Sequence, residues 1–156
     1  MAASARLAIC GLAAALLAGG TVAAAREPAS PYPVASDFRV GGDARQTRFV
    51  VDLDRKVEMR AFTLADPYRV VIDLPQVTFR LPPHAGESGR GLVKAFRYGL
   101  VMQGGSRMVL DVSGPVRVEK AFVIEPVDGQ PARMVLDIAA TDRETFLPAE
   151  LTESAQ

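Results

Sequence analysis

The chain has very few of the residues on which metal sites and thiol chemistry depend. Its 156 residues include one cysteine, Cys10, one histidine, His84, and no tryptophan. A hydrolytic zinc site needs about three protein ligands, usually histidines with a carboxylate, so a zinc enzyme has no support. His84 stands in a loop rich in proline and glycine and is interpreted as a solvated loop residue. The sequence predicts no metal and no cofactor.

The chain also lacks an excess of charge of one sign and the common catalytic motifs. Lys and Arg number 18, as do Asp and Glu, which gives a formal net charge of zero and no electrostatic case for nucleic acid. No Gly-x-Ser-x-Gly elbow, P-loop or Gly-x-Gly-x-x-Gly motif is present. Four aspartates would be candidates for paired acid catalysis, but we expect each to lie beside an arginine, which favours the ionised form and makes it unsuited to acid catalysis. We therefore predict a module without catalytic activity of its own.

The N-terminal segment has the pattern of a secretory signal peptide. Arg6 precedes an apolar run over residues 7–18, and Ala23-Ala24-Ala25 follows. The run is shorter than the ~20 residues that span a bilayer, so we expect cleavage after Ala25 and export to the periplasm without a lasting membrane anchor. Cleavage removes Cys10, and the stability of the mature chain must then come from a hydrophobic core and not from disulfides.

The most informative feature of the sequence is a six-residue pattern that occurs four times. The pattern is Arg-φ-Val-φ-Asp-φ, where φ is a large apolar residue, and the copies begin at Arg48, Arg69, Arg107 and Arg133. In an extended strand, Arg, Val and Asp point to one side and the three φ residues to the other. Strands of this kind build an antiparallel sheet with one buried and one solvated face.

The four hexads belong to an internal duplication. Phe38-Arg39-Val40-Gly41 precedes the first hexad as Phe96-Arg97-Tyr98-Gly99 precedes the third, and each half then runs through Val-Glu and Ala-Phe to its second hexad. This order predicts eight strands in two homologous sets of four that can face each other. We expect an all-β fold, a β-sandwich of two four-stranded, mainly antiparallel sheets.

The composition also suggests where the parts of the chain begin and end. We assign residues 1–25 to the signal peptide, 26–36 to a flexible spacer rich in proline and small residues, 37–140 to the β-sandwich, and 141–156 to a polar tail or the start of a linker. A break rich in proline and glycine, residues 75–91, joins the two halves and needs no more than one short turn of helix.

The charged sides of the hexads are the candidate functional surface. Arg and Asp of one strand are roughly 13 Å apart, too far to pair with each other. If two hexads pair antiparallel and in register about their Val, the Arg of one stands opposite the Asp of the other. Such a ladder could serve solubility alone, each exposed pair contributing about 0–1 kcal/mol. Alternatively, it forms a flat surface of hydrogen-bond donors and acceptors for a polymer with carboxylates, amides and hydroxyls.

The candidate ligand-binding residues are Arg48, Asp52, Arg69, Asp73, Arg107, Asp111, Arg133 and Asp137. Tyr68 and Tyr98, each beside an arginine, would add ring surfaces for a sugar or a peptide, or they are ordinary strand tyrosines.

Residues 37–139 resemble the AMIN domain, the non-catalytic N-terminal module of periplasmic N-acetylmuramoyl-L-alanine amidases. The matching features are the Phe-Arg-x-Gly motif, the first hexad, and the segment from Phe62 to Pro67 that leads into the second hexad. Each of these features has a counterpart in the second half. The resemblance implies a β-sandwich that binds peptidoglycan and directs a cell-wall amidase to the division site. It also places the polymer-facing residues at the Arg and Asp of the four hexads.

Nothing in these 156 residues is similar to the zinc domain that follows the module in such amidases. We therefore expect either a shortened amidase product or a free-standing targeting module, with no amidase activity in this chain. The alternative function is a protein-interaction scaffold of the envelope, which docks a divisome partner or a secretin-associated complex on a sheet edge.

Overall fold

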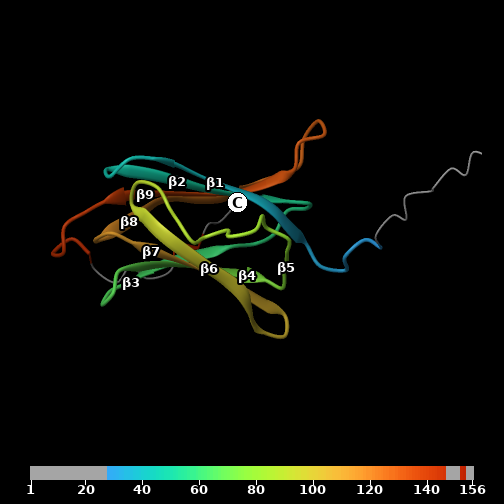
Figure 1. Cartoon of the computed structure of the whole chain (residues 1–156), viewed down its shortest axis with the longest axis horizontal. Coiled ribbons are helices and arrows are strands. Elements are labelled where there is room, and N and C mark those ends of the chain that lie inside the picture. Colours follow the sequence, from blue (N-terminus) through green and yellow to red (C-terminus); the bar gives the residue numbers. More distant parts are fainter. Residues whose placement is uncertain (1–27, 147–151, 154–156) are drawn as a thin grey trace, which may run out of the picture.

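The computed structural model describes residues 28–146 and 152–153, and the predicted signal peptide lies outside this part. The described residues form ten strands and no helix (Figure 1). The strands are β1 (Val34–Gly42), β2 (Gln46–Leu53), β3 (Arg60–Leu64), β4 (Arg69–Pro75), β5 (Thr78–Phe79), β6 (Val93–Met102), β7 (Gly105–Val112), β8 (Val116–Ile124), β9 (Ala132–Ala140) and β10 (Thr152–Glu153).

The strands form two sheets that pack face to face as a sandwich. One sheet has the order β5-β1-β2-β9-β8 and the other the order β10-β3-β4-β7-β6. All pairs of neighbouring strands are antiparallel except β1 with β5. The predicted sandwich of two mainly antiparallel sheets is confirmed. Each sheet has the four long strands expected and, at one edge, an additional strand of two residues.

The two halves of the duplication do not face each other as separate sheets. Each half gives one hairpin to each sheet, so β1–β2 joins β8–β9 and β3–β4 joins β6–β7. Exchanging the equivalent strands of the halves converts the order β1-β2-β9-β8 into β6-β7-β4-β3, which is the other sheet in reverse. The halves therefore share both sheets, and the two outer faces of the sandwich are equivalent by the duplication.

The core lies between the sheets and is built from the φ residues of the hexads. All twelve φ residues are 6% exposed or less. They alternate along β2, β4, β7 and β9 with the outward Arg, Val and Asp, as a period of two requires. Burying each large apolar side chain contributes roughly 1.5–3 kcal/mol. The hexads thus supply both the core and the solvated faces of the sandwich.

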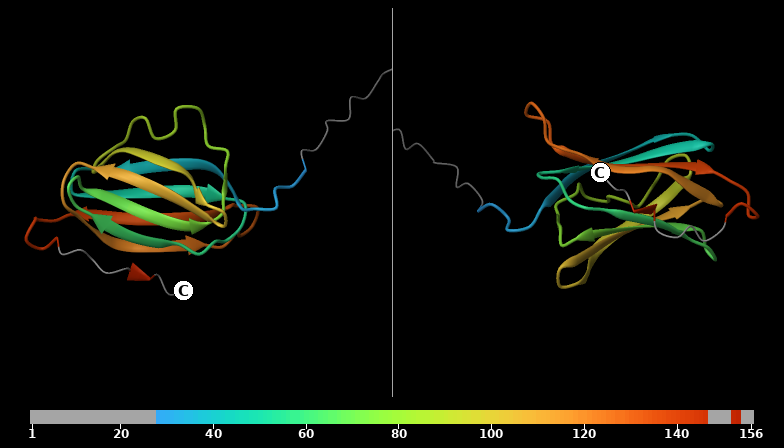
Figure 2. Two further views of the ribbon diagram at one scale, coloured as in Figure 1. Left: turned by 90° about the horizontal axis from the view of Figure 1, so that it is seen from below. Right: turned by 180° about the vertical axis from the view of Figure 1, so that it is seen from behind.

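The linker between the halves runs along the edge of the sandwich beside β1 and β6, where Figure 2 (left) shows it as a yellow-green loop. The Arg80 N–H donates to the Ala35 carbonyl at 2.8 Å, and the Phe96 N–H donates to the Gly86 carbonyl at 3.0 Å. These bonds satisfy backbone groups that an edge strand would otherwise leave open.

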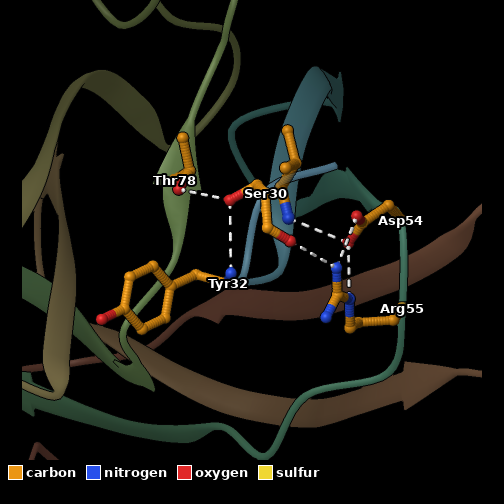
Figure 3. Close-up of polar contacts among 6 residues, drawn as sticks. Ser30, Tyr32, Asp54, Arg55 and Thr78 are labelled. Atoms are coloured by element: carbon orange, nitrogen blue, oxygen red, sulfur yellow. Dashed lines mark hydrogen bonds and ion pairs between the residues drawn. The ribbon is translucent and has the colours of Figure 1, made fainter. Parts of the chain in front are cut away.

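Part of the segment predicted as a flexible spacer is docked onto the sandwich. Strand β1 begins at Val34, and the Pro33 carbonyl accepts from the Thr78 N–H at 2.8 Å. Figure 3 shows Ser30 bonded to Thr78 and to the Arg55 guanidinium. Proline removes a donor but keeps its carbonyl, so a proline-rich segment can still be held through its acceptors.

The polar C-terminal segment also meets the sandwich where the structure describes it. Strand β10 pairs antiparallel with β3 at the edge of its sheet. The Phe146 ring packs edge-on against Tyr68, with ring centroids 5.1 Å apart. The segment predicted as a tail therefore begins against the second sheet.

Candidate ligand-binding faces

The hexads pair in the register that places opposite charges across from each other. In the central pair of the first sheet, Val50 lies opposite Val135 and Arg48 opposite Asp137. In the second sheet, Val71 lies opposite Val109 and Arg107 opposite Asp73. The predicted antiparallel register about the valines is therefore what the structure shows.

One ion pair of the ladder forms across each central strand pair. The Arg48 Nε and Nη2 donate to the two carboxylate oxygens of Asp137 at 2.7 and 2.8 Å. The Arg107 Nε and Nη2 donate to Asp73 at 2.6 and 3.2 Å. These hydrogen bonds to a carboxylate raise the pKa of both arginines. The two bidentate pairs occupy equivalent positions on the two outer faces.

The other two hexad aspartates are bound by arginines that the sequence reasoning did not include in the site. Arg39 of β1 donates to both oxygens of Asp52, at 2.8 and 3.1 Å, and this raises the pKa of Arg39. Arg97 of β6 donates to Asp111 at 3.3 Å. Both arginines come from the repeated Phe-Arg-x-Gly motifs. The signal that could have identified them was the repetition of that motif in both halves.

The remaining hexad arginines, Arg69 and Arg133, form no ion pair with any residue that the structure describes. Arg133 lies opposite Asp52 in register, but both Asp52 oxygens already accept from Arg39. The Arg133 Nε is buried without a hydrogen-bond partner. The Arg69 Nε instead donates to the Pro67 carbonyl at 3.2 Å. All four predicted Arg–Asp pairs are therefore opposite each other in register, but only two of them form ion pairs.

The two outer faces carry the same residues at equivalent places. The central row reads Arg39, Val50, Val135 and Phe122 on the first sheet and Arg97, Val109, Val71 and Phe62 on the second. Val135 and Val71 lie outside the core cluster but are only 4% and 3% exposed. Since outward valines are short, the longer side chains around them must cover them. Each face is therefore apolar at its centre and charged around it.

The two tyrosines do not lie beside the arginines on these faces. Tyr98 is opposite Met108, an inward residue, and its ring lies 4.9 Å from the ring of Phe79. Tyr68 packs against the core cluster. Because side chains alternate along a strand, Tyr98 points away from Arg97. The structure favours a structural role for both, Tyr98 as a residue of β6 and Tyr68 as a turn residue before β4.

A groove of about 350 Å³ opens on the first sheet beside the Arg48–Asp137 pair. Its lining includes Gln46, whose side-chain amide donates to Glu119 at 3.2 Å, and the turn residues Gly41 and Gly42. Gly42 has a φ of +111°, and a Cβ there would collide with the Gln46 carbonyl oxygen, so the turn requires glycine. The groove offers donors and acceptors at the end of an otherwise flat face.

His84 is exposed in the linker, where its Nδ1 lies 3.0 Å from a Glu87 carboxylate oxygen. No group of three or more His, Cys, Asp and Glu side chains that could hold a metal occurs among the described residues. In the same part of the chain, no helix is long and apolar enough to cross a membrane.

Fold and faces together define a duplicated β-sandwich with two equivalent charged surfaces. Comparison with known protein families gives a match to the AMIN domain over residues 37–138, and the chain belongs to this family. The match covers both halves of the duplication and all four hexads, which confirms the resemblance seen in the sequence. No curated protein matches the chain. The domain that is detected is non-catalytic, and its family is associated with peptidoglycan-targeting modules of envelope proteins.

Proposed function

We propose that this chain is an exported, non-catalytic module that binds peptidoglycan and targets a cell-wall amidase system to the division septum. The observation that carries the proposal is the match to the AMIN domain across the entire duplication. The signal-peptide pattern supports export to the periplasm, where peptidoglycan is the first polymer that the protein meets.

The form of the faces supports a polymer as the ligand. Guanidinium and carboxylate groups on a flat sheet can exchange hydrogen bonds with the amides, hydroxyls and carboxylates of a glycan-peptide mesh. The first sheet contributes Arg48, Asp52, Arg133 and Asp137, and the second contributes Arg69, Asp73, Arg107 and Asp111. Two equivalent faces would allow one molecule to engage two strands of the mesh, which raises the apparent affinity without a deep pocket.

Co-sedimentation with purified peptidoglycan sacculi tests the proposal. Residues 26–156, which contain all the described residues, should pellet with sacculi and remain in solution without them. Adding salt should weaken the binding because exposed charge pairs are screened. Binding no better than that of an unrelated neutral protein of the same size would refute the proposal.

A second candidate is a scaffold that docks another envelope protein, and one surface feature favours it. Three consecutive apolar residues are exposed at the tip of the β6–β7 hairpin. The exposed fractions are 58% for Leu100, 51% for Val101 and 68% for Met102. The equivalent β1–β2 tip has Gly42, Asp43 and Ala44, so the apolar tip is a property of the second half alone. Consecutive exposed apolar residues are typical of contact sites.

The two candidates predict different effects of the same substitutions. A scaffold would lose its envelope partner in cross-linking experiments when Val101 and Met102 are replaced by serine, and would keep it when the face arginines are neutralised. Peptidoglycan binding would show the reverse pattern.

A further inference from the structure

We propose that Arg133 is the residue that recognises the ligand, and that the group it binds is a carboxylate next to a small apolar side chain, as at the C-terminus of a short stem peptide. The inference rests on the proposed peptidoglycan binding and names the chemical group within that polymer. It starts from the hydrogen-bond pattern of the first outer face.

Four arginines point outward from the first sheet, and three of them are held by acidic partners. Arg39 is bound to Asp52, Arg48 to Asp137, and Arg117 to Glu119 at 2.8 Å. Arg133 has no ion pair or hydrogen bond with the described residues, and its Nε is buried. A buried donor without an acceptor destabilises the fold, and such groups are rare in native proteins unless they serve a function. The Nε itself is covered, so an external acceptor would meet the terminal Nη groups of Arg133, which also have no partner among the described residues.

The surroundings of Arg133 keep its guanidinium available. Its neighbour on β2 is Asp52, whose two oxygens already accept hydrogen bonds from Arg39. Its neighbour on β8 is Ile124, which offers no acceptor side chain. Arg39 thus acts as a positioning residue, because its two hydrogen bonds hold the Asp52 carboxylate, which forms its ion pair with Arg39 and not with Arg133.

The duplication provides an internal comparison at Arg69, the equivalent residue of the second face. Its Nε already donates to the Pro67 carbonyl. Asp111 opposite it is held by one hydrogen bond of 3.3 Å from Arg97, compared with two shorter ones on Asp52. Arg69 therefore has fewer unused donors than Arg133. The aspartate opposite Arg69, Asp111, also accepts fewer hydrogen bonds from a neighbouring arginine than Asp52 does. We expect the first face to bind carboxylates more tightly than the second.

The chemical class of the ligand follows from the guanidinium and its neighbours. A planar fork of N–H donors matches the two oxygens of a carboxylate. Ile124 lies opposite Arg133 on β8, and Phe122 lies two residues before Ile124 on the same face; both side chains are half-buried. An apolar surface beside the guanidinium suits a carboxylate that carries an aliphatic group, because a phosphate or sulfate would have nothing to place there. A peptide C-terminus with a methyl side chain satisfies both requirements.

Sacculi whose stem-peptide carboxylates have been converted to amides provide the direct test. Wild-type protein should bind native sacculi about tenfold or more tightly than amidated sacculi, the size expected for loss of one bidentate charged contact. Arg133→Gln should lower binding to native sacculi by a similar factor, and it should bind amidated sacculi as the wild type does. Arg133→Lys should bind native sacculi more weakly than wild type, because it keeps the charge but not the fork.

Arg90→Gln is the matched control, since it removes one exposed arginine from the linker and not from a face. It should bind like the wild type. Equal binding of wild type to native and amidated sacculi, or wild-type binding by Arg133→Gln, would refute the role of Arg133 while leaving peptidoglycan binding intact. Failure of the wild type to bind native sacculi at all would refute both proposals. Coincident thermal unfolding of the variants and the wild type would establish that all are folded.

Discussion

Replacing Arg39 by glutamine should weaken ligand binding about tenfold, although Arg39 does not itself contact the ligand. In the wild type, the two hydrogen bonds from Arg39 occupy Asp52, and Arg133 is left unpaired. Without Arg39, Asp52 is the nearest acceptor across the β2–β9 pair, and Arg133 should turn to it. The free guanidinium of the first face would then be lost.

The stability change should be small because one ion pair replaces another. The Arg39 side chain is 52% exposed and that of Asp52 13%, so solvent screens the pair and its loss should cost about 1 kcal/mol. A new cross-strand pair between Arg133 and Asp52 should return roughly 0.2–1 kcal/mol. Urea unfolding should therefore show a net loss of about 0.5 kcal/mol, while binding to sacculi falls by about tenfold.

The double variant Arg39→Gln/Asp52→Asn distinguishes this mechanism from simple loss of a charge. It removes the carboxylate that captures Arg133, so binding should recover toward the wild-type level. The Arg133 Nε–H signal in an NMR spectrum should shift in Arg39→Gln and return in the double variant. An unchanged affinity in Arg39→Gln, or no recovery in the double variant, would refute the reasoning.

Three further predictions concern stability and pH. Arg133→Leu should leave the free energy of unfolding unchanged or raise it by about 1 kcal/mol, because a buried donor without a partner is removed; a clear loss in urea unfolding would show that the donor is satisfied. Phe49→Ala should lower the free energy of unfolding by roughly 3–5 kcal/mol, since Phe49 is fully buried and packs on the Phe96 ring; a loss below about 1 kcal/mol would place it outside the core. Burial opposes ionisation of Asp54, but the Val34 N–H and the Arg55 guanidinium outweigh it and hold the pKa of Asp54 below its ordinary 3.8. Its contribution should be complete above that pH and lost as the pH falls below it, so the Val34 amide signal should titrate in that range in the wild type and not in Asp54→Asn.

The sequence predicts the core and the register of this fold well because both depend on short patterns. A period of two decides which side of a strand is buried, and all twelve φ residues are buried as predicted. Pairing about the central valines is the register that sets opposite charges together, and Val50 lies opposite Val135 accordingly.

Other features could not be read from the pattern because they depend on contacts between distant segments. The sequence of a hexad does not show which of the two sheets its hairpin joins. The sequence therefore did not predict that each half contributes one hairpin to each sheet. Considering only directly opposite residues also missed Arg39, which reaches Asp52 from a diagonal position on the neighbouring strand. The docking of residues 30–36 depends on hydrogen bonds to Thr78 and Asp54, which lie far along the chain.

Chemical-shift mapping with soluble peptidoglycan fragments tests most directly the claim that the outer faces bind the polymer. The amide signals of β2, β4, β7 and β9 should shift on titration, with larger changes around Arg133 than around Arg69. Shifts restricted to the β6–β7 tip or to the free edge of β8, with the hexad strands unaffected, would contradict the account.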